Sequence, residues 1–578
     1  MSLRKPALFF SLPLLCLATA CANARSRVHL GSPPRPVGAL VLAPDRGFLG
    51  NEELRDALAP LSRKVPLEMV FVTDARARET LGEALQRLRT RGVGRIVALP
   101  AFLFSADPRF RLACRLLAEA RTRTPTPIET AAVFGRSSFA LEVLAAELRG
   151  LPGSRDIVLV GYGASGSFPR EEMEGELLAT ARRAADGTSH ELKGAVVWPD
   201  IFDRRAGEAS RSASQRLSEL LKEAPRPAVL AFHLGPKLDG MMAFDRVLRR
   251  NLPRGVELVE TPHLAPAVAL WAEREIRRRT PLRATAIGVV LLAHGGDYHW
   301  NEAVRRAVAP LQDRYLVEFA FSMADPDVVE RAVRRLENRG AEAVVVVRAY
   351  ALRSSFREAV ESMIGSLREG EAAPRHHGAH RHGHGTRRIL SPLPMVTVGG
   401  LEDDPLFAEA LWERVREIST DPPRETLILT AHGAGEDRRN EHWLEVLRSL
   451  ARQIAEKAEK THRPFRHIHV ATWREDWPEK RTEWVRRIRR LVEEAAGQGG
   501  RAIVLPARVA GEGPERRYLE GLSYELGSGF APHPLFVRWV EKQIRRGIEK
   551  LRNEAASDSS CALVPGEKSA SRTREENP

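Results

Sequence analysis

The feature that most constrains the fold of this 578-residue chain is an internal repeat. The segment LVLAPDRGFLGNEELRDALAPL (40–61) aligns without gaps with VLLAHGGDYHWNEAVRRAVAPL (290–311). A second pair relates IVLVGYGASG (157–166) to LILTAHGAGE (427–436), and the register of this pair continues through the segments downstream. Repeated units of this length indicate an array built from one kind of structural module. The chain is therefore predicted to contain four copies of one unit.

Each copy alternates short β-branched runs with helical patterns, such as Val329, Val333 and Leu336 at the spacing of one helix face. Alternating strands and helices predict an α/β fold with a parallel sheet and helices on both of its faces. We expect four lobes arranged as two bilobal halves. The predicted lobes are A1 (36–150), B1 (155–279), A2 (284–400) and B2 (424–550).

The N-terminal residues differ in kind from the repeat. Arg4 and Lys5 precede an apolar run and then small residues, the arrangement of a secretory signal peptide over residues 1–24. The sequence LATAC, which ends at Cys21, resembles a lipobox, so a lipid anchor at Cys21 is one expectation and cleavage after Ala24 is the other. Both predict an exported protein, either free in the periplasm or attached to the envelope as a lipoprotein.

Composition narrows the chemistry. After removal of a signal peptide, the remaining cysteines are too few and too scattered for a disulfide framework or a thiolate metal site. Metal chemistry would then depend on His, Asp or Glu.

The net charge of +14 predicts either a solvated basic face or a groove that attracts an acidic ligand. No nucleic-acid motif accompanies this charge, so no nucleic-acid partner is expected. Residues 551–578 are predicted to be a disordered tail.

Two histidines directly follow buried strands. His294 and His432 each stand between an apolar run and a glycine, at the strand end where α/β sheets bind ligands. Three interpretations compete: a histidine that hydrogen-bonds within a tight turn, an esterase oxyanion segment, and a base that handles metal. The esterase interpretation needs a G-x-S-x-G elbow downstream, but the nearest candidate, GASGS (163–167), lies upstream and ends in serine.

The surrounding motifs favour the metal interpretation. VVLLAHGGDYHWNEAVRRAV, followed by MADPDVVERAVRRLENRGAEAVVVV, resembles the sirohydrochlorin cobaltochelatases and ferrochelatases of cobalamin and siroheme synthesis, the class II chelatases. The resemblance covers A2 and B2 well, and A1 and B1 as faded copies. It implies four chelatase-like (flavodoxin-like) lobes, and a lyase that inserts Co²⁺, Fe²⁺ or Ni²⁺ as substrate into an acidic tetrapyrrole without an organic cofactor. It also implies that His294 and His432 are catalytic and contact the metal.

The sequence departs from the family pattern in three places. Arg348 stands where the family has proline, and Ser354 lies near the position of a second family histidine, so that ligand is missing. In the N-terminal half, Pro44 and Tyr162 replace the strand-end histidines, which predicts a structural role for A1 and B1. The alternatives to an enzyme are an exported, non-catalytic metal- or tetrapyrrole-binding protein derived from a chelatase, and a scaffold in which all four lobes are kept for shape.

Several other polar residues accompany the two histidines. Glu436 is a predicted metal ligand and Asp297 a candidate ligand or proton relay, because both lie on the histidine loops. Asn51, Asn301 and Asn440, each followed by glutamate, recur at helix starts, and the persistence of Asn51 in A1 favours helix capping.

Further histidines occur outside the strand-end loops. His263 and His533 recur in PH contexts and are expected to cap or pack, not to catalyse. The segment RHHGAHRHGHG (375–385) is predicted to be a flexible insert that collects metal. Its predicted ligands are His376, His377, His380, His382 and His384.

Overall fold

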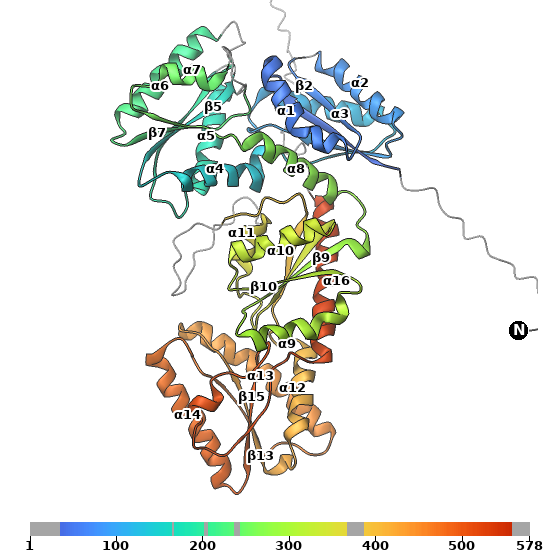
Figure 1. The fold of residues 1–578 in the computed structure, drawn as a ribbon, viewed down its shortest axis with the longest axis vertical. Helices are drawn as coiled ribbons and strands as arrows, with labels where there is room; N and C mark the ends of the chain where they lie inside the picture. Colours follow the sequence, from blue (N-terminus) through green and yellow to red (C-terminus); the bar gives the residue numbers. More distant parts are fainter. Residues whose placement is uncertain are drawn as a thin grey trace, which may run out of the picture. The chain divides into compact units, whose positions relative to one another are not determined.

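The computed structural model describes residues 35–74, 76–164, 167–200, 206–235, 243–366 and 387–557. The predicted signal peptide with Cys21, the five histidines of the 375–385 insert and most of the predicted tail lie outside these residues. Within them, four separate sheets each contain four parallel strands with helices packed on them (Figure 1). The predicted α/β fold with four lobes is therefore confirmed.

The two lobes of the N-terminal half have the same order of elements. Lobe A1 contains β1 (Val37–Pro44), α1 (Gly47–Ser62), β2 (Leu67–Val72), α2 (Ala77–Thr90), β3 (Arg95–Pro100), α3 (Pro108–Arg123), β4 (Ile128–Thr130) and α4 (Ser138–Gly150). Lobe B1 contains β5 (Asp156–Ala164), α5 (Ser167–Ala184), β6 (Glu191–Pro199), α6 (Gly207–Lys222), β7 (Pro227–Ala231), α7 (Phe244–Asn251), β8 (Glu257–Val259) and α8 (Leu264–Arg278).

The C-terminal half repeats this order. Lobe A2 contains β9 (Ile287–Ala293), α9 (Tyr298–Val308), β10 (Leu316–Phe321), α10 (Pro326–Asn338), β11 (Ala343–Ala349), α11 (Arg357–Ile364), β12 (Met395–Gly399) and α12 (Pro405–Ile418). Lobe B2 contains β13 (Glu425–Ala431), α13 (Asp437–Lys460), β14 (His467–Thr472), α14 (Pro478–Gly497), β15 (Arg501–Pro506), α15 (Glu515–Tyr518), β16 (Glu525–Leu526) and α16 (Pro534–Ser557).

All four sheets share one strand order, in which the first strand of the lobe lies between the second and the third. In A2 this order is β10-β9-β11-β12, and in B2 it is β14-β13-β15-β16. Every residue of β9 and β13 is buried, because helices cover both faces of these central strands. This burial explains the continuous apolar runs that precede His294 and His432. The fold therefore places both histidines at the carboxyl end of a central strand.

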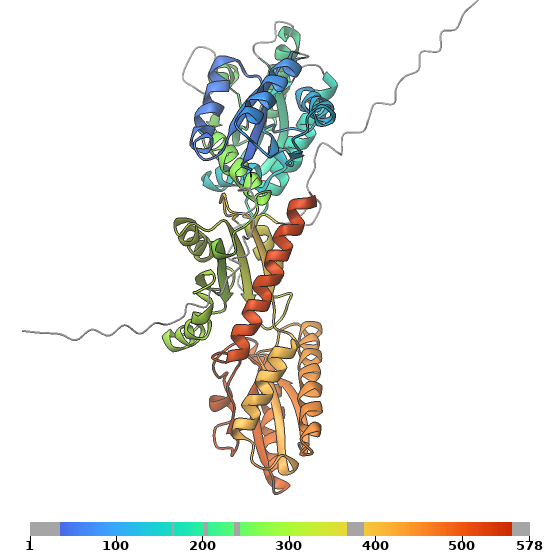
Figure 2. The same cartoon turned by 90° about the vertical axis from the view of Figure 1, so that its right-hand side faces the viewer.

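The last helix of each lobe packs on the neighbouring lobe of the same half. In the N-terminal half, α8 packs on α1 and β3 of A1, and α4 packs on α5 of B1 (Figure 1). In the C-terminal half, α16 lies along β11 and β12 of A2 (Figure 2), while α12 contacts α13 and β15 of B2. The exchanged helices join the two lobes of each half through a shared apolar core. None of the helices in the described ranges is both long enough and apolar enough to cross a membrane.

Candidate functional site

The loops that carry His294 and His432 have the same local conformation. Gly295 and Gly433, the residues after the histidines, both have φ of +83°, a left-handed conformation that favours glycine. The ring atom Nδ1 lies 2.9 Å from the carbonyl oxygen of Gly295 in His294, and 3.0 Å from that of Gly433 in His432. A carbonyl can only accept, so Nδ1 carries the proton and donates it in both rings. This hydrogen bond orients the ring so that Nε2 points away from the turn. Histidines that bind a metal through Nε2 are held in the same way.

An asparagine braces the strand-end loop in three lobes. Asn51, Asn301 and Asn440 each accept, through Oδ1, the backbone N–H two residues after the strand-end position. In B2 the same oxygen also accepts the hydroxyl of Thr472, and Asn440 is buried. The prediction that these residues cap their helices is wrong, because their side chains reach back to the loop. The brace fixes the turn whether or not a histidine occupies it.

His432 has a polar and an aromatic neighbour from the loop after β14. Its Nε2 lies 3.2 Å from Oδ2 of Asp476, and its ring meets the ring of Trp477 edge-on at 5.9 Å between centroids. Asp476 is exposed, whereas about a third of the His432 side chain is accessible. Nδ1 of His432 thus faces the turn, and Nε2 faces the carboxylate of Asp476.

Other charged groups surround the strand ends of B2. Arg474 and Lys480 both contact Asp437, and their hydrogen bonds hold the pKa of this carboxyl below its usual value. Arg508 pairs with Glu475, and burial lowers the pKa of the Arg508 guanidinium. Asp437 and Glu475 are thus each paired with a cation. Asp476 is the carboxylate that faces His432.

His294 lies in more open surroundings. Its side chain is exposed, and its Nε2 has no hydrogen-bond partner among the described residues. Tyr298, four residues later, is 73% exposed, and Met323, which follows the neighbouring strand β10, is 47% exposed. The only other large apolar side chain with such exposure in the described residues is Phe48 in A1. Exposed apolar groups beside a polar side chain suit a flat, largely apolar ligand.

The strand-end loops of A2 and B2 meet at Trp300. Its indole Nε1 donates to the carbonyl oxygen of Ala510, at 3.0 Å, in the loop after β15. A Cβ added to Gly511 would lie 3.1 Å from the Trp300 ring, so glycine allows the close approach. In the described residues, no hydrogen bond or ring contact joins His294 to His432 directly.

The remaining predicted residues have other contacts. Glu436 is exposed and pairs with Arg439, at 3.4 Å, and it makes no hydrogen bond or ion pair with His432 in the described residues. Asp297 caps α9 by accepting the N–H of Trp300, at 2.8 Å. Within the described residues, no group of three or more His, Cys, Asp and Glu side chains has an arrangement that could hold a metal ion.

The PH histidines of the two halves differ from each other. His533 is buried and accepts the N–H of Leu535, at 3.2 Å, so its expected capping role is confirmed. His263 is exposed, and its side chain makes no capping hydrogen bond to α8. His263 therefore neither caps α8 through its side chain nor packs in the core, unlike the expectation that it does one or the other.

In the N-terminal half, an arginine lies at the ends of the central strands, where the C-terminal half has its two histidines. Arg46 lies in the loop after β1, and its guanidinium lies 3.4 Å from Asp200 of B1 and over the ring of Tyr162. Arg109 also pairs with Asp200, at 3.0 Å, and the Tyr162 hydroxyl donates to the same carboxylate. A Cβ on Gly163 would lie 2.2 Å from the Arg46 guanidinium. The strand ends of A1 and B1 are thus joined by a buried ionic network.

Sequence reasoning missed Asp476, Tyr298 and Met323. A signal for the first was present, because an acidic residue follows the second strand in both B lobes, in WPD (198–200) and WRED (473–476). No comparable signal marked the exposed apolar residues. Their accessibility depends on which neighbours cover them, and the periodicity of the sequence does not define those neighbours.

Comparison with known proteins gives one family match. The model of the CbiX family, the sirohydrochlorin chelatase family, matches residues 49–150. The match therefore falls in A1, one of the two lobes that the sequence analysis describes as faded copies. No curated protein matches the chain.

The solved structures that match are distant. A LacI family transcriptional regulator from Mycobacterium smegmatis is 15% identical, with a TM-score of 0.26, and the alignment covers 42% of this chain and 91% of that one. A periplasmic ribose ABC transporter from Conexibacter woesei is 12% identical, with a TM-score of 0.20 and coverage of 53% and 85%. These scores are too low to bear on fold or function. The family match supports a chelatase-like function at the level of the family, because residues 49–150 of this chain match the model of the CbiX family of sirohydrochlorin chelatases.

Proposed function

We propose that the C-terminal half inserts a divalent metal, Co²⁺ or Fe²⁺, into a sirohydrochlorin-like tetrapyrrole, with His294 and His432 at the reaction site. The observation that carries this proposal is the shared geometry of the two rings. In both, Nδ1 is held by the carbonyl of the next glycine, so the metal-binding nitrogen Nε2 is the one left for chemistry. The family match of residues 49–150 supports the class of reaction.

The reaction needs a base. When a divalent ion enters the macrocycle, bonds to its four nitrogens form, two pyrrole N–H bonds break, and two protons are released. The accessible Nε2 of His294 accepts one of these protons. Nε2 of His432 accepts the other proton after the metal ion has left this nitrogen, and the nearby carboxylate of Asp476 then stabilises the imidazolium.

The metal substrate needs a site that releases it. His432 Nε2 and Asp476 Oδ2 are 3.2 Å apart, which suits two adjacent ligands of one ion with bonds of about 2.0–2.2 Å. A site with two protein ligands holds an ion less firmly than the four-ligand sites of structural zinc. Weak binding favours transfer of the ion to the four nitrogens of the macrocycle. In this proposal the metal ion is a substrate that the protein binds and releases.

The tetrapyrrole is expected to lie against the exposed apolar groups near His294. Tyr298 and Met323 supply accessible apolar surface beside this residue. The acidic substituents of the substrate are attracted by the arginine-rich chain, whose net charge is +14.

The test is an insertion assay with the purified full-length chain. The absorption spectrum of sirohydrochlorin is followed with Co²⁺, Ni²⁺ and Fe²⁺ in separate reactions. We expect His294→Ala and His432→Ala each to lower the rate by about 10²- to 10⁴-fold, the usual contribution of a general base. The matched control is His299→Ala, which removes an exposed histidine from the start of α9. Equal rates in all four proteins would contradict the proposed mechanism.

The second candidate function is binding without turnover. It is favoured by the absence of the second family histidine, since Arg348 and Ser354 occupy that region of A2. Calorimetry with Co²⁺ and with sirohydrochlorin separates the two candidates. Tight binding without any spectral change from metal insertion would select the binding protein.

The N-terminal segment and the histidine-rich insert support two further proposals about supply. We propose that the chain is exported, and the mass of the mature N-terminus distinguishes lipid attachment at Cys21 from cleavage after Ala24.

We also propose that residues 375–385 collect metal for the site. Deletion of these residues should lower the insertion rate at limiting Co²⁺ but not at saturating Co²⁺. An unchanged rate at limiting Co²⁺ would contradict this role.

A further inference from the structure

Arg348 places a charge at a position that is uncharged in the other three lobes. In A2 it pairs in register with Leu292, two residues before the strand-end position of β9. The residues at the same register in the other lobes are Pro100, Ala231 and Pro506. The repeat therefore provides an internal comparison. Only A2 carries a cation at this point of the third strand.

The Arg348 guanidinium is buried and makes no ion pair with any described residue. The residue is 3% exposed. Its Nε donates to the Thr397 hydroxyl at 3.1 Å, and its Nη1 donates to the carbonyl oxygens of Arg353 and Ser355, both at 2.8 Å. No carboxylate within the described ranges makes an ion pair with it, and burial lowers its pKa to about 10. Its hydrogen bonds go to neutral groups, and the effect of burial outweighs the favourable charge of Glu361, so the site favours an anion.

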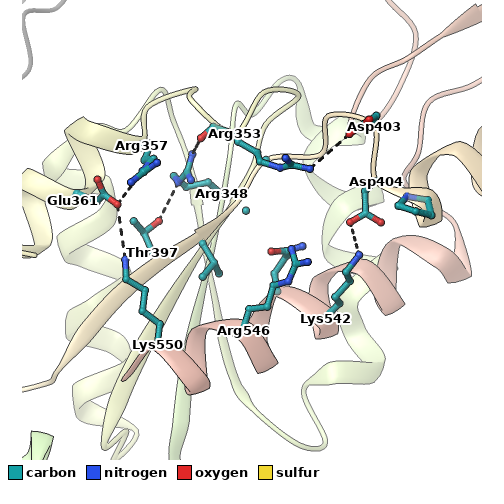
Figure 3. Close-up of a pocket in the computed structure, with 15 residues that line it drawn as sticks. Arg348, Arg353, Arg357, Glu361, Thr397, Asp403, Asp404, Lys542, Arg546 and Lys550 are labelled. Carbon is teal, nitrogen blue, oxygen red and sulfur yellow. Dashed lines mark hydrogen bonds and ion pairs between the residues drawn. The ribbon is translucent and has the colours of Figure 1, made fainter. Parts of the chain in front are cut away.

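A cavity of about 370 Å³ lies beside this guanidinium (Figure 3). Its walls come from the ends of β11 and β12 and from α16, and its lining contains six Arg and Lys side chains but only three Asp and Glu. Four of the other five cations are already paired with carboxylates. Lys542 pairs with Asp404 at 2.7 Å, Arg357 with Glu361 at 3.1 Å, Arg353 with Asp403 at 3.7 Å and Lys550 with Glu361 at 3.9 Å. The cavity is therefore electropositive after its internal ion pairs are counted.

Arg546 is the second cation available to a ligand. It projects from α16, is exposed, and makes no ion pair or hydrogen bond with any described residue. Figure 3 shows Arg348 on the β11 side and Arg546 on the α16 side of the same cavity. Two guanidinium groups on opposite walls suit a ligand that has a negative group at each end.

We propose that this cavity binds a small organic anion that carries at least two carboxylate or phosphate groups, held between Arg348 and Arg546. The volume is within the usual range for small-molecule sites, so a ligand larger than a single phosphate group is expected. No lining residue belongs to the loops after β9 or β13, which carry His294 and His432. His294 and His432 therefore do not line this cavity, and the proposal does not depend on their function.

The test uses isothermal titration calorimetry of the full-length chain at low ionic strength, with pyrophosphate and citrate as probes. We expect saturable binding of at least one probe, and the tighter of the two identifies phosphate or carboxylate as the preferred group. Arg348→Gln and Arg546→Gln should each raise the dissociation constant at least tenfold. The matched control is Arg545→Gln, an exposed neighbour on α16 that pairs with Glu541 outside the cavity and should bind as the wild type does.

Arg546→Gln keeps the test independent of folding, because the residue is exposed and makes no contact that the fold needs. Absence of saturable binding of both probes, or equal affinity in the wild type and Arg546→Gln, would overturn the proposal. His294→Ala should leave probe binding unchanged, which separates this site from the insertion site. Loss of probe binding in His294→Ala would show that the two sites are one and would also overturn the proposal.

Discussion

The indole nitrogen of Trp300 lies 3.0 Å from the carbonyl oxygen of Ala510 and joins the start of α9 in A2 to the loop after β15 in B2. Trp300 is six residues after His294, so this contact bears on how that histidine is held relative to lobe B2. We expect Trp300→Phe, which keeps an aromatic ring but removes the donor, to lower the free energy of unfolding by about 0.5–1.5 kcal/mol. Urea unfolding followed by circular dichroism measures the change.

The control for Trp300 is Trp484→Phe. Trp484 lies on α14, and its indole nitrogen makes no hydrogen bond with the described residues. This variant should unfold at the same urea concentration as the wild type. A loss of stability in Trp484→Phe as large as in Trp300→Phe would show that the effect is not due to the hydrogen bond.

Arg46 is expected to be structurally essential in the N-terminal half. Arg46→Ala removes a buried cation from Asp200 and Asp107, whose side chains are almost fully buried. Removal of one partner from a buried ion pair costs about 3–5 kcal/mol, because the other charge stays buried. Thermal unfolding of Arg46→Ala, beside the exposed control Arg63→Ala, measures this difference. Similar midpoints for the two variants would refute the structural role of this network.

The asparagine brace predicts a graded effect in the C-terminal half. Asn440→Ala leaves the buried N–H of Ala434 and the hydroxyl of Thr472 without their acceptor, which costs about 1–3 kcal/mol. Asn301→Ala breaks solvent-exposed hydrogen bonds in A2 and should cost less. Chemical denaturation of both variants gives the order, and a larger loss in Asn301→Ala would contradict the account.

Acid should destabilise the chain in part through His533. Burial, with a contribution from Arg414, lowers the pKa of His533 below its usual value of about 6.5, although Glu413 opposes the shift. As the pH falls through 6.5, the unfolded chain takes up this proton before the folded chain does, so the free energy of unfolding decreases. Once the pH is below the pKa of His533 in the folded chain, this group no longer lowers the free energy of unfolding.

His533→Gln should therefore reduce the loss of stability between pH 7 and pH 5. The matched control is His263→Gln, which replaces the exposed histidine at the corresponding place in B1 and should keep the wild-type pH dependence. Unfolding curves collected across this pH range give the comparison. If His533→Gln loses as much stability on acidification as the wild type, the burial of a neutral His533 is not a source of acid sensitivity.

The sequence predicted the elements that depend on local pattern. The apolar runs of β9 and β13, and the glycine turns after them, were recognisable because burial on both faces and a left-handed turn each restrict residue choice. The exchange of α4, α8, α12 and α16 between lobes was not predicted, because an amphipathic pattern does not specify the partner of the apolar face.

The side-chain partners were the least predictable part of the site. Arg46 and Asp200 are separated by more than 150 residues, and neither belongs to a motif that predicts their contact. The three asparagines were recognised as a repeated feature, but their role was predicted incorrectly, since a helix start can use its polar side chain for capping or for bracing the loop. Only the position of the backbone N–H groups distinguishes the two roles.

The central claim is that the strand-end histidines of the C-terminal half transfer metal into the tetrapyrrole. The most direct measurement is a single-turnover reaction of Co²⁺ and sirohydrochlorin with the full-length chain and with the double variant His294→Ala, His432→Ala, followed by absorbance. The account predicts insertion by the wild type, and a rate for the double variant equal to that without protein, with unchanged circular dichroism. Insertion by the double variant at the wild-type rate would contradict it.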